Sequence, residues 1–245
     1  MSRNVTVALL SLALVAVSAE AAGAIPSSLT AAVADSGRPE ADKAKDANRK
    51  PAETLAFAGV RPGMTVAELA PGGGYYTRLL AKAVGPKGKV LAVATAAQAA
   101  RPNGLATLNG IVAAYPNVSI VTVADYASMK LPAKADLFWT TENYHDFHNG
   151  PTANIAGLNK AVFDNLKPGG VFYVEDHSAA PGAGLEATSK FHRMDEDVAK
   201  QELKAAGFRS IAEADLLRNP KDDRAGSNSE SGHFLSDRFM LKAKK

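Results

Sequence analysis

Cysteine is absent from the 245-residue sequence. This absence excludes disulfide bonds, thiolate metal ligands and a cysteine nucleophile, and it also excludes lipidation on cysteine. The folded chain must therefore be held together by its core alone. About 220 residues follow the first apolar segment described below, which is enough for one sizeable α/β domain.

A strong charge of one sign is also lacking. The formal net charge is +3, the basic residues are interspersed with acidic ones, and no run of Lys and Arg contains interleaved aromatic residues. A concentrated positive charge and a basic run with interleaved aromatic residues are the features expected of a nucleic-acid-binding surface. The composition therefore predicts that nucleic acid is not a partner.

No apolar run is long enough to span a bilayer comfortably, which takes about 20 residues. The one conspicuous run extends from Val5 to Val17, after Arg3, and small residues suited to signal peptidase stand at Ala22-Gly23-Ala24 or at Val17-Ser18-Ala19. This pattern predicts a cleaved signal peptide over residues 1–24 and a periplasmic or secreted protein without stable membrane association after cleavage. An uncleaved anchor and a buried first helix are the alternatives.

Beyond the signal, residues 25–50 are polar and rich in alanine, and we expect them to form a solvated helix or a wrapping arm. Residues 51–245 then alternate between short apolar runs and helical patterns, which predicts one α/β domain with a doubly wound parallel sheet. The last strand follows a loop too short for a crossover helix, so it should be antiparallel. The expected strands are Met64–Ala70, Lys89–Thr95, Val118–Ala124, Ala135–Thr140, Gly170–Glu175, Arg209–Asp215 and a seventh within residues 233–244; the expected helices cover 51–59, Tyr75–Val84, Leu105–Tyr115, Asn154–Leu166 and Ser189–Ala206.

A glycine turn joins the first expected strand to the next helix. In the stretch VAELAPGGGYYTRLL, three consecutive glycines precede Tyr75. Backbone N–H groups in such a turn can approach a ligand closely, with the positive end of the helix dipole behind them. The turn lies at the carboxyl end of a strand, where ligands bind in open α/β sheets.

This stretch resembles the first motif of the class I S-adenosylmethionine-dependent methyltransferases, and the chain is similar to exported bacterial proteins described as predicted methyltransferases. VADY, LKPGGVFYVEDH and LKAAGF continue the resemblance. It implies a Rossmann-like, seven-stranded sheet with its last strand antiparallel, and S-adenosylmethionine as cofactor. It implies that Asp125 faces the adenine amino group. The cofactor-binding residues that it implies are Glu68, Ala70, Pro71, Gly72, Gly73, Gly74, Tyr75, Asp125 and Tyr126.

The sequence departs from the family pattern at two positions. Ala70 stands where the first glycine of the motif is usual, and Ala94 stands about where an acidic residue would hold the ribose hydroxyls. Thr95 or Gln98 could compensate in part for the missing acid. An exported protein also needs a source of S-adenosylmethionine outside the cytoplasm.

Acidic residues and histidines gather after the fourth and fifth expected strands, in WTTENYHDFHNG and YVEDHSAAPGAG. A methyltransferase needs a base for the proton of its acceptor, and histidine titrates in the useful range. We expect the catalytic residues among His145, Asp146, Asp176 and His177. No metal site is assigned. His145 and His148 with Asp176 or His177 could still form one, or these loop side chains could simply satisfy one another.

The sequence thus predicts an S-adenosylmethionine-dependent methyltransferase that acts on a small-molecule nucleophile. Two alternatives remain on the same fold. One is a periplasmic enzyme of another class, metal-assisted or acid–base, and the other is a small-ligand-binding protein without turnover.

Overall fold

The computed structural model describes residues 24–229 and 235–245. Its seven strands form a single sheet in the order β3-β2-β1-β4-β5-β7-β6. Strands β1 to β5 pair in parallel, whereas β7 pairs antiparallel with both β5 and β6. The strands are β1 (Thr65–Leu69), β2 (Lys89–Thr95), β3 (Val118–Val123), β4 (Ala135–Thr141), β5 (Leu166–His177), β6 (Ser210–Ala214) and β7 (Arg238–Lys244).

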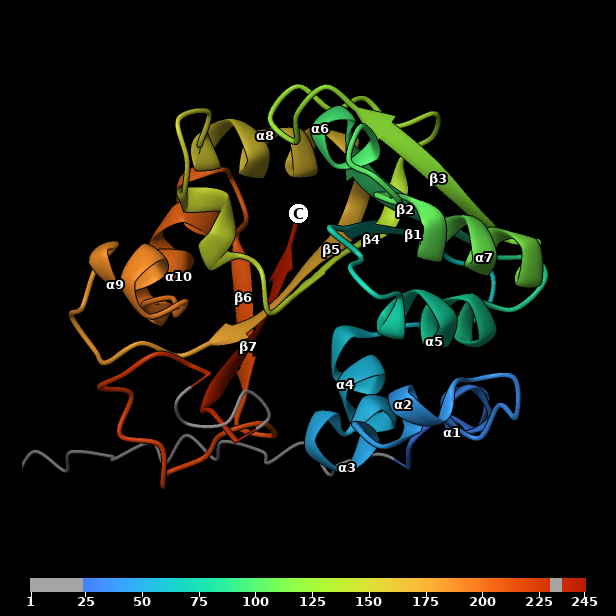
Figure 1. The fold of residues 1–245 in the computed structure, drawn as a ribbon, viewed down its shortest axis with the longest axis horizontal. Coiled ribbons are helices and arrows are strands. Elements are labelled where there is room, and N and C mark those ends of the chain that lie inside the picture. Colours follow the sequence, from blue (N-terminus) through green and yellow to red (C-terminus); the bar gives the residue numbers. More distant parts are fainter. Residues whose placement is uncertain (1–23, 230–234) are drawn as a thin grey trace, which may run out of the picture.

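Helices cover both faces of this sheet (Figure 1). They are α1 (Ser27–Val33), α2 (Glu40–Lys43), α3 (Asp46–Arg49), α4 (Pro51–Ala58), α5 (Tyr75–Val84), α6 (Ala96–Ala99), α7 (Ala106–Ala114), α8 (Ile155–Asn165), α9 (Glu186–Lys190) and α10 (Glu196–Ala205), with a 3-10 turn, η1, at His145–His148.

Successive side chains of a strand point to opposite faces of the sheet, so they pack into two separate cores. Val66 and Trp139 pack with α1, α4, α5 and α7 on one face, whereas their neighbours Ala67 and Phe138 pack with α8 and α10 on the other. Figure 1 shows α4 and α5 on one side of the sheet and α8 and α10 on the opposite side. The result is a three-layer α/β/α arrangement.

The predicted fold class is confirmed, including the antiparallel last strand. The expected helix Ser189–Ala206 is wrong as a single element, because the chain leaves α9 at Phe191 and starts α10 only after Asp195. Between them, Met194 bridges to Ser178 beside β5, and the Arg193 side chain is fully buried. A buried arginine needs its own partners, and the chain breaks the helix to supply them.

Two expected strands also differ from the observed ones by more than one residue at an end. Strand β5 is longer than Gly170–Glu175, since pairing with β7 carries it to His177. Strand β7 begins at Arg238, and residues 230–234, which include part of the expected strand, lie outside the described residues.

Residues 25–50 wrap onto the domain as three short helices. Leu29 and Ala32 are buried in the core shared with α5. The buried Arg38 pairs with Asp46 at 2.6 Å, and Asp42 pairs with Arg78 of α5 at 3.0 Å. This segment therefore contributes to the core and is not merely solvated.

The expected signal peptide, residues 1–24, lies outside the described residues except for its last residue. Among the helices that the structure describes, none combines the length and apolarity needed to cross a membrane.

Candidate functional site

The glycine turn connects the end of β1 to α5 and contains three left-handed residues. Ala70, Gly72 and Gly74 have φ angles of 47°, 54° and 76°. A Cβ on Gly74 would also overlap Ile111 of α7, whereas a Cβ on Gly73 would meet nothing within 4 Å. Glycine is thus required at position 74 by both backbone conformation and helix packing, and at position 72 by conformation alone.

A cavity of about 350 Å³ opens over this turn, and we call it the glycine-turn cavity. Six of the seven turn residues predicted from the motif reach it, while Gly74 faces the packed helix instead. The wall is mostly polar and includes charges of both signs. Its lining residues are Asp42, Lys45, Arg49, Glu68, Ala70, Pro71, Gly72, Gly73, Tyr75, Tyr76, Thr141, Glu142, Asn143 and Asp146.

Glu68, near the end of β1, lines the cavity. Its side chain accepts a hydrogen bond of 2.6 Å from Thr77 and is almost fully buried. Burial raises the pKa of the Glu68 carboxyl to about 8, against the lowering effects of Thr77 and Arg78. The group is therefore largely protonated at neutral pH in this structure.

A chain of ion pairs includes two of the lining residues, Arg49 and Glu142. Arg238 of β7 donates to Glu142 at 2.8 Å and to Glu175 at 2.9 Å, and Arg49 also pairs with Glu142. Glu142 adopts a φ of 55°, so the end of β4 turns sharply to place it there. The motif resemblance did not identify Glu142 or Arg238; the sequence signal was only the polar run that follows β4.

A second cavity, of about 210 Å³, lies beside the end of β3, and we call it the Asp125 cavity. Tyr126 packs edge-on against Phe147 with ring centroids 5.1 Å apart. Asp125 is exposed, and it accepts hydrogen bonds from the backbone and hydroxyl of Ser128, which lower the pKa of its carboxyl. The cavity is lined by Thr95, Ala97, Ala124, Asp125, Tyr126, Ala127, Asp146, Phe147, Asn149, Thr152, Ala153, Asn154 and Leu158.

Ala94, at the expected ribose position, is buried at the end of β2. Its neighbours Thr95 and Gln98 form a capping box at the start of α6: the Thr95 hydroxyl accepts from the Gln98 backbone, and Gln98 Oε1 accepts from the Thr95 backbone at 2.8 Å. Gln98 Oε1 also accepts from the Tyr126 hydroxyl at 3.1 Å. The two residues named as replacements for the missing acid thus already organise this rim of the Asp125 cavity.

Three of the four predicted catalytic residues converge. His145 Nδ1 donates to the buried Asp176 carboxylate at 2.8 Å, and Asp176 also accepts the backbone N–H groups of His145 and His177. The other ring nitrogen, Nε2, lies 3.3 Å from Asp146 Oδ1. A carboxylate therefore flanks each nitrogen of the ring.

These two carboxylates control the charge of His145. Burial alone would lower the pKa of the imidazole, but the charge of Asp176 and the hydrogen bonds to Asp146 and Asp176 outweigh it and raise the pKa to about 10. In this arrangement the ring carries a proton at neutral pH, which differs from the general base expected from the sequence.

The 3-10 turn η1 that presents His145 and Asp146 is clamped from behind. His148 Nε2 lies 2.8 Å from Glu202 of α10, and the Tyr144 hydroxyl donates to the same carboxylate at 3.0 Å. His148 thus points away from His145. The arrangement does not bring His145 and His148 together as a pair of metal ligands.

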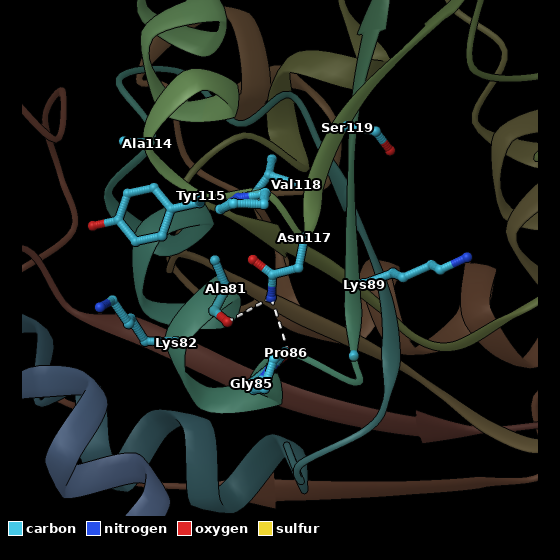
Figure 2. A pocket seen from close by; sticks show the side chains of 12 residues that line it. Ala81, Lys82, Gly85, Pro86, Lys89, Ala114, Tyr115, Asn117, Val118 and Ser119 are labelled. Carbon is cyan, nitrogen blue, oxygen red and sulfur yellow. Dashed lines mark hydrogen bonds between the residues drawn. The ribbon is translucent and has the colours of Figure 1, made fainter.

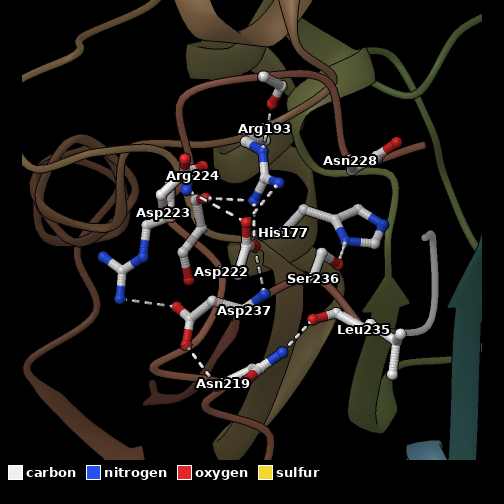
Figure 3. A network of polar contacts seen from close by, with 12 residues as sticks. His177, Arg193, Asn219, Asp222, Asp223, Arg224, Asn228, Leu235, Ser236 and Asp237 are labelled. Atoms are coloured by element: carbon white, nitrogen blue, oxygen red, sulfur yellow. Dashed lines mark hydrogen bonds and ion pairs between the residues drawn. The ribbon is translucent and has the colours of Figure 1, made fainter. Parts of the chain in front are cut away.

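His177, the fourth predicted catalytic residue, is fully buried and lines neither cavity. Its Nδ1 lies 2.6 Å from the Ser236 hydroxyl. Figure 3 shows this pair beside a network in which Arg193 contacts Asp222 and Asp237 contacts Arg224. The placement favours a structural role for His177.

Asp146 is the residue common to both cavities. Its side chain is 55% exposed, and its Oδ1 also lies 3.7 Å from Nδ1 of His192, which sits in the break between α9 and α10. His145, Asp146 and His192 therefore meet where the two cavities meet.

Another hollow, of about 650 Å³, lies at the opposite end of the strands, near the starts of β2 and β3 (Figure 2). Asn117 bridges the carbonyls of Ala81 and Gly85 there at 2.8 and 3.0 Å. Ligands of open α/β sheets bind at the carboxyl ends of the strands. We therefore assign the functional site to the two cavities around Asp146.

The sheet order with its antiparallel last strand matches a known architecture. A methyltransferase from Aquifex aeolicus that depends on S-adenosylmethionine superposes with a TM-score of 0.55 at 19% identity, over 78% of this chain and 87% of that one. The chain has the fold of the class I methyltransferases. This confirms the fold that the motif resemblance implied.

Two further solved structures show the same fold. Human N-acetylserotonin methyltransferase in complex with S-adenosylmethionine matches with a TM-score of 0.53 at 16% identity, over 79% of this chain and 51% of that one. A possible exported protein from Bordetella parapertussis matches with a TM-score of 0.52 at 15% identity, over 84% and 67%. Comparisons with protein-family models and with curated proteins found no match.

Proposed function

We propose that this protein is an exported S-adenosylmethionine-dependent methyltransferase that acts on a small-molecule nucleophile. The observation that carries the proposal is the pair of cavities at the ends of β1 and β3, which meet at Asp146. The first has charged walls suited to an amino-acid group, and the second has an aromatic wall suited to a flat base. The solved neighbours named above support the same cofactor class.

The residues present fit the cofactor at both ends. In the glycine-turn cavity, Arg49 and Lys45 supply cations for a carboxylate, and Glu142 supplies an anion for an ammonium group. In the Asp125 cavity, Tyr126 and Phe147 offer ring faces and edges, and Asp125 offers an exposed carboxylate to an amino group. Asn143 holds the turn in place, because its amide donates to the Ala70 carbonyl at 3.1 Å.

Bound S-adenosylmethionine supplies an electrophilic methyl group on a sulfonium sulfur. The protein's own task is to orient an acceptor atom in line with that methyl and to exclude water. His145, fixed by Asp176, and the more exposed Asp146 stand at the junction of the cavities, where they would hold the acceptor and its proton. Transfer of that methyl group to the acceptor would leave S-adenosylhomocysteine.

Calorimetric titration of the purified chain with S-adenosylhomocysteine tests the proposal. We expect saturable binding that weakens about tenfold or more in Asp125→Ala and in Arg49→Met, since a charged hydrogen bond contributes about 1.5–3 kcal/mol. Asp223→Ala, in an exposed loop away from both cavities, is the matched control and should bind as the wild type does. An absence of binding at millimolar ligand would remove the cofactor assignment.

A further inference from the structure

His145 and Asp146, to which the proposed function gives the acceptor, form a group with a third residue, His192, that the proposed function does not use. One potential ligand atom from each lies within 4.8 Å of the other two. In tetrahedral coordination, metal–ligand bonds of about 2.0–2.2 Å place two ligand atoms about 3.3–3.6 Å apart. Closing the set thus requires shifts of up to about 1.5 Å, and the His192 and Asp146 side chains, each 55% exposed, have room for that movement.

The buried member of the set is oriented as a metal ligand is. Asp176 holds Nδ1 of His145 at 2.8 Å and is itself fixed by two backbone N–H groups. This leaves Nε2 directed toward Asp146. Metal-binding histidines almost always donate their second ring N–H to a carboxylate or carbonyl in this way, which sets the tautomer and ring orientation.

The third member is placed by the chain around it. His192 has a φ of 51° and its carbonyl accepts from the Asn228 side chain at 2.9 Å. Its neighbours Arg193 and Met194 are both buried. A non-glycine residue in a left-handed conformation costs of order 1–3 kcal/mol and such residues cluster at functional sites. The fold thus holds a half-exposed histidine at this point despite the strain.

We propose that His145 Nε2, Asp146 Oδ1 and His192 Nδ1 bind a divalent first-row cation such as Zn²⁺. Two imidazoles and one carboxylate form a donor set that suits Zn²⁺, Fe²⁺ or Ni²⁺ better than Ca²⁺ or Mg²⁺. The cation would replace the proton on Nε2 of His145, and with both imidazoles then neutral, the carboxylates of Asp146 and Asp176 balance its charge. Three protein ligands also leave a coordination position open, as in catalytic metal sites.

The open coordination position indicates which class of methyl acceptor the site would take, and this part of the inference rests on the proposed function. Asp146 borders both cavities, so a ligand in that position faces the methyl donor. The acceptor would be a molecule with a hydroxyl or enol oxygen that loses its proton to solvent on binding the cation. That oxygen then forms its bond to the methyl carbon as the carbon–sulfur bond breaks.

Titration of the untagged, chelator-treated chain with Co²⁺ tests the site, because Co²⁺ occupies zinc sites and its visible absorption reports its ligands. We expect one equivalent to bind with a visible band, and His192→Ala and Asp146→Asn each to lose affinity tenfold or more. Asp176→Asn should weaken binding by about 10–100-fold. Asp164→Asn on α8, an aspartate as exposed as Asp146 that pairs with Lys160, is the matched control and should bind as the wild type does.

Thermal melting of every variant shows whether it is folded, so that a loss of binding is not confused with unfolding. His192 and Asp146 are exposed enough for their variants to fold. The inference fails if the wild type shows no saturable Co²⁺ binding, or if His192→Ala and Asp146→Asn bind Co²⁺ as tightly as the wild type. Titration of the same samples with S-adenosylhomocysteine separates the two proposals. If S-adenosylhomocysteine binds and Co²⁺ does not, only the metal site is removed. If Co²⁺ binds and S-adenosylhomocysteine does not, only the cofactor assignment is removed.

Discussion

At the residue scale, the site concentrates conformational strain. Ala70, Glu142 and His192 all have positive φ angles, and all three lie at the edge of the sheet where the cavities open. Left-handed backbone costs an L-residue with a Cβ roughly 1–2 kcal/mol. Ala70 is the clearest case, because the motif that this chain resembles has a glycine there.

Ala70→Gly should therefore stabilise the protein. Relief of the left-handed strain outweighs the added freedom of the unfolded chain, so we expect a gain of up to about 1 kcal/mol in the free energy of unfolding. Denaturant titration measures it. The control is Ala113→Gly, on the exposed face of α7, which should cost about 0.5–1 kcal/mol. Equal losses at the two positions would show that Ala70 is unstrained.

The buried Glu68 predicts how the stability of the protein depends on pH. The pKa of its buried carboxyl is about 8 in the folded state against an ordinary 4.5. The unfolded state therefore loses this proton first, and the stability contributed by Glu68 falls as pH rises from about 4.5 to about 8. The slope of this contribution is at most about 1.4 kcal/mol per pH unit.

Glu68→Gln keeps an acceptor for Thr77 but cannot ionise, so it should remove this decline. Urea unfolding at several pH values between 5 and 8 compares the two proteins, with Glu186→Gln, at an exposed position of α9, as the control. Parallel stability curves for wild type and Glu68→Gln would contradict the assignment of a protonated, buried Glu68.

At the element scale, the sequence predicted the strands and most helices well because each is a simple apolar pattern between glycine and proline signals. The break between α9 and α10 was missed for a physical reason. The pattern in Ser189–Ala206 continues through Arg193, and a sequence reading places an arginine on the exposed face. Its burial depends on Asp222, which lies 29 residues away in the chain. The same break brings His192 to the site, so the site was predicted only in part.

Arg193→Met should show how strongly this pair holds the loop between β6 and β7. Arg193 and Asp222 are 2.8 Å apart with side chains 0% and 1% exposed (Figure 3). Removing one partner of a buried ion pair costs about 3–5 kcal/mol, whereas removing both costs less. We therefore expect a large loss of stability in Arg193→Met and partial recovery in the double variant Arg193→Met/Asp222→Asn, measured by chemical unfolding. A change below 1 kcal/mol would contradict the buried-pair account.

At the scale of the whole molecule, residues 25–50, expected to form a solvated helix or a wrapping arm, contact both the core and the glycine-turn cavity. Composition could not reveal this, because polar, alanine-rich helices bury only a few side chains each. Leu29 is fully buried against α5, and Lys45 and Arg49 border the glycine-turn cavity.

Two shortened chains, one beginning at Ile25 and one at Pro51, test this directly. The first keeps every contact of the arm described above and should melt as the full chain does. The second loses Leu29, whose burial alone contributes about 1.5–3 kcal/mol, so its melting temperature should fall by about 5 °C or more. It should also lose affinity for S-adenosylhomocysteine, because the cations of the cavity wall are gone. If the chain from Pro51 melts and binds like the longer one, residues 25–50 contribute nothing to stability or to binding. The carboxylate of the cofactor would then pair with a cation elsewhere on the sheet edge.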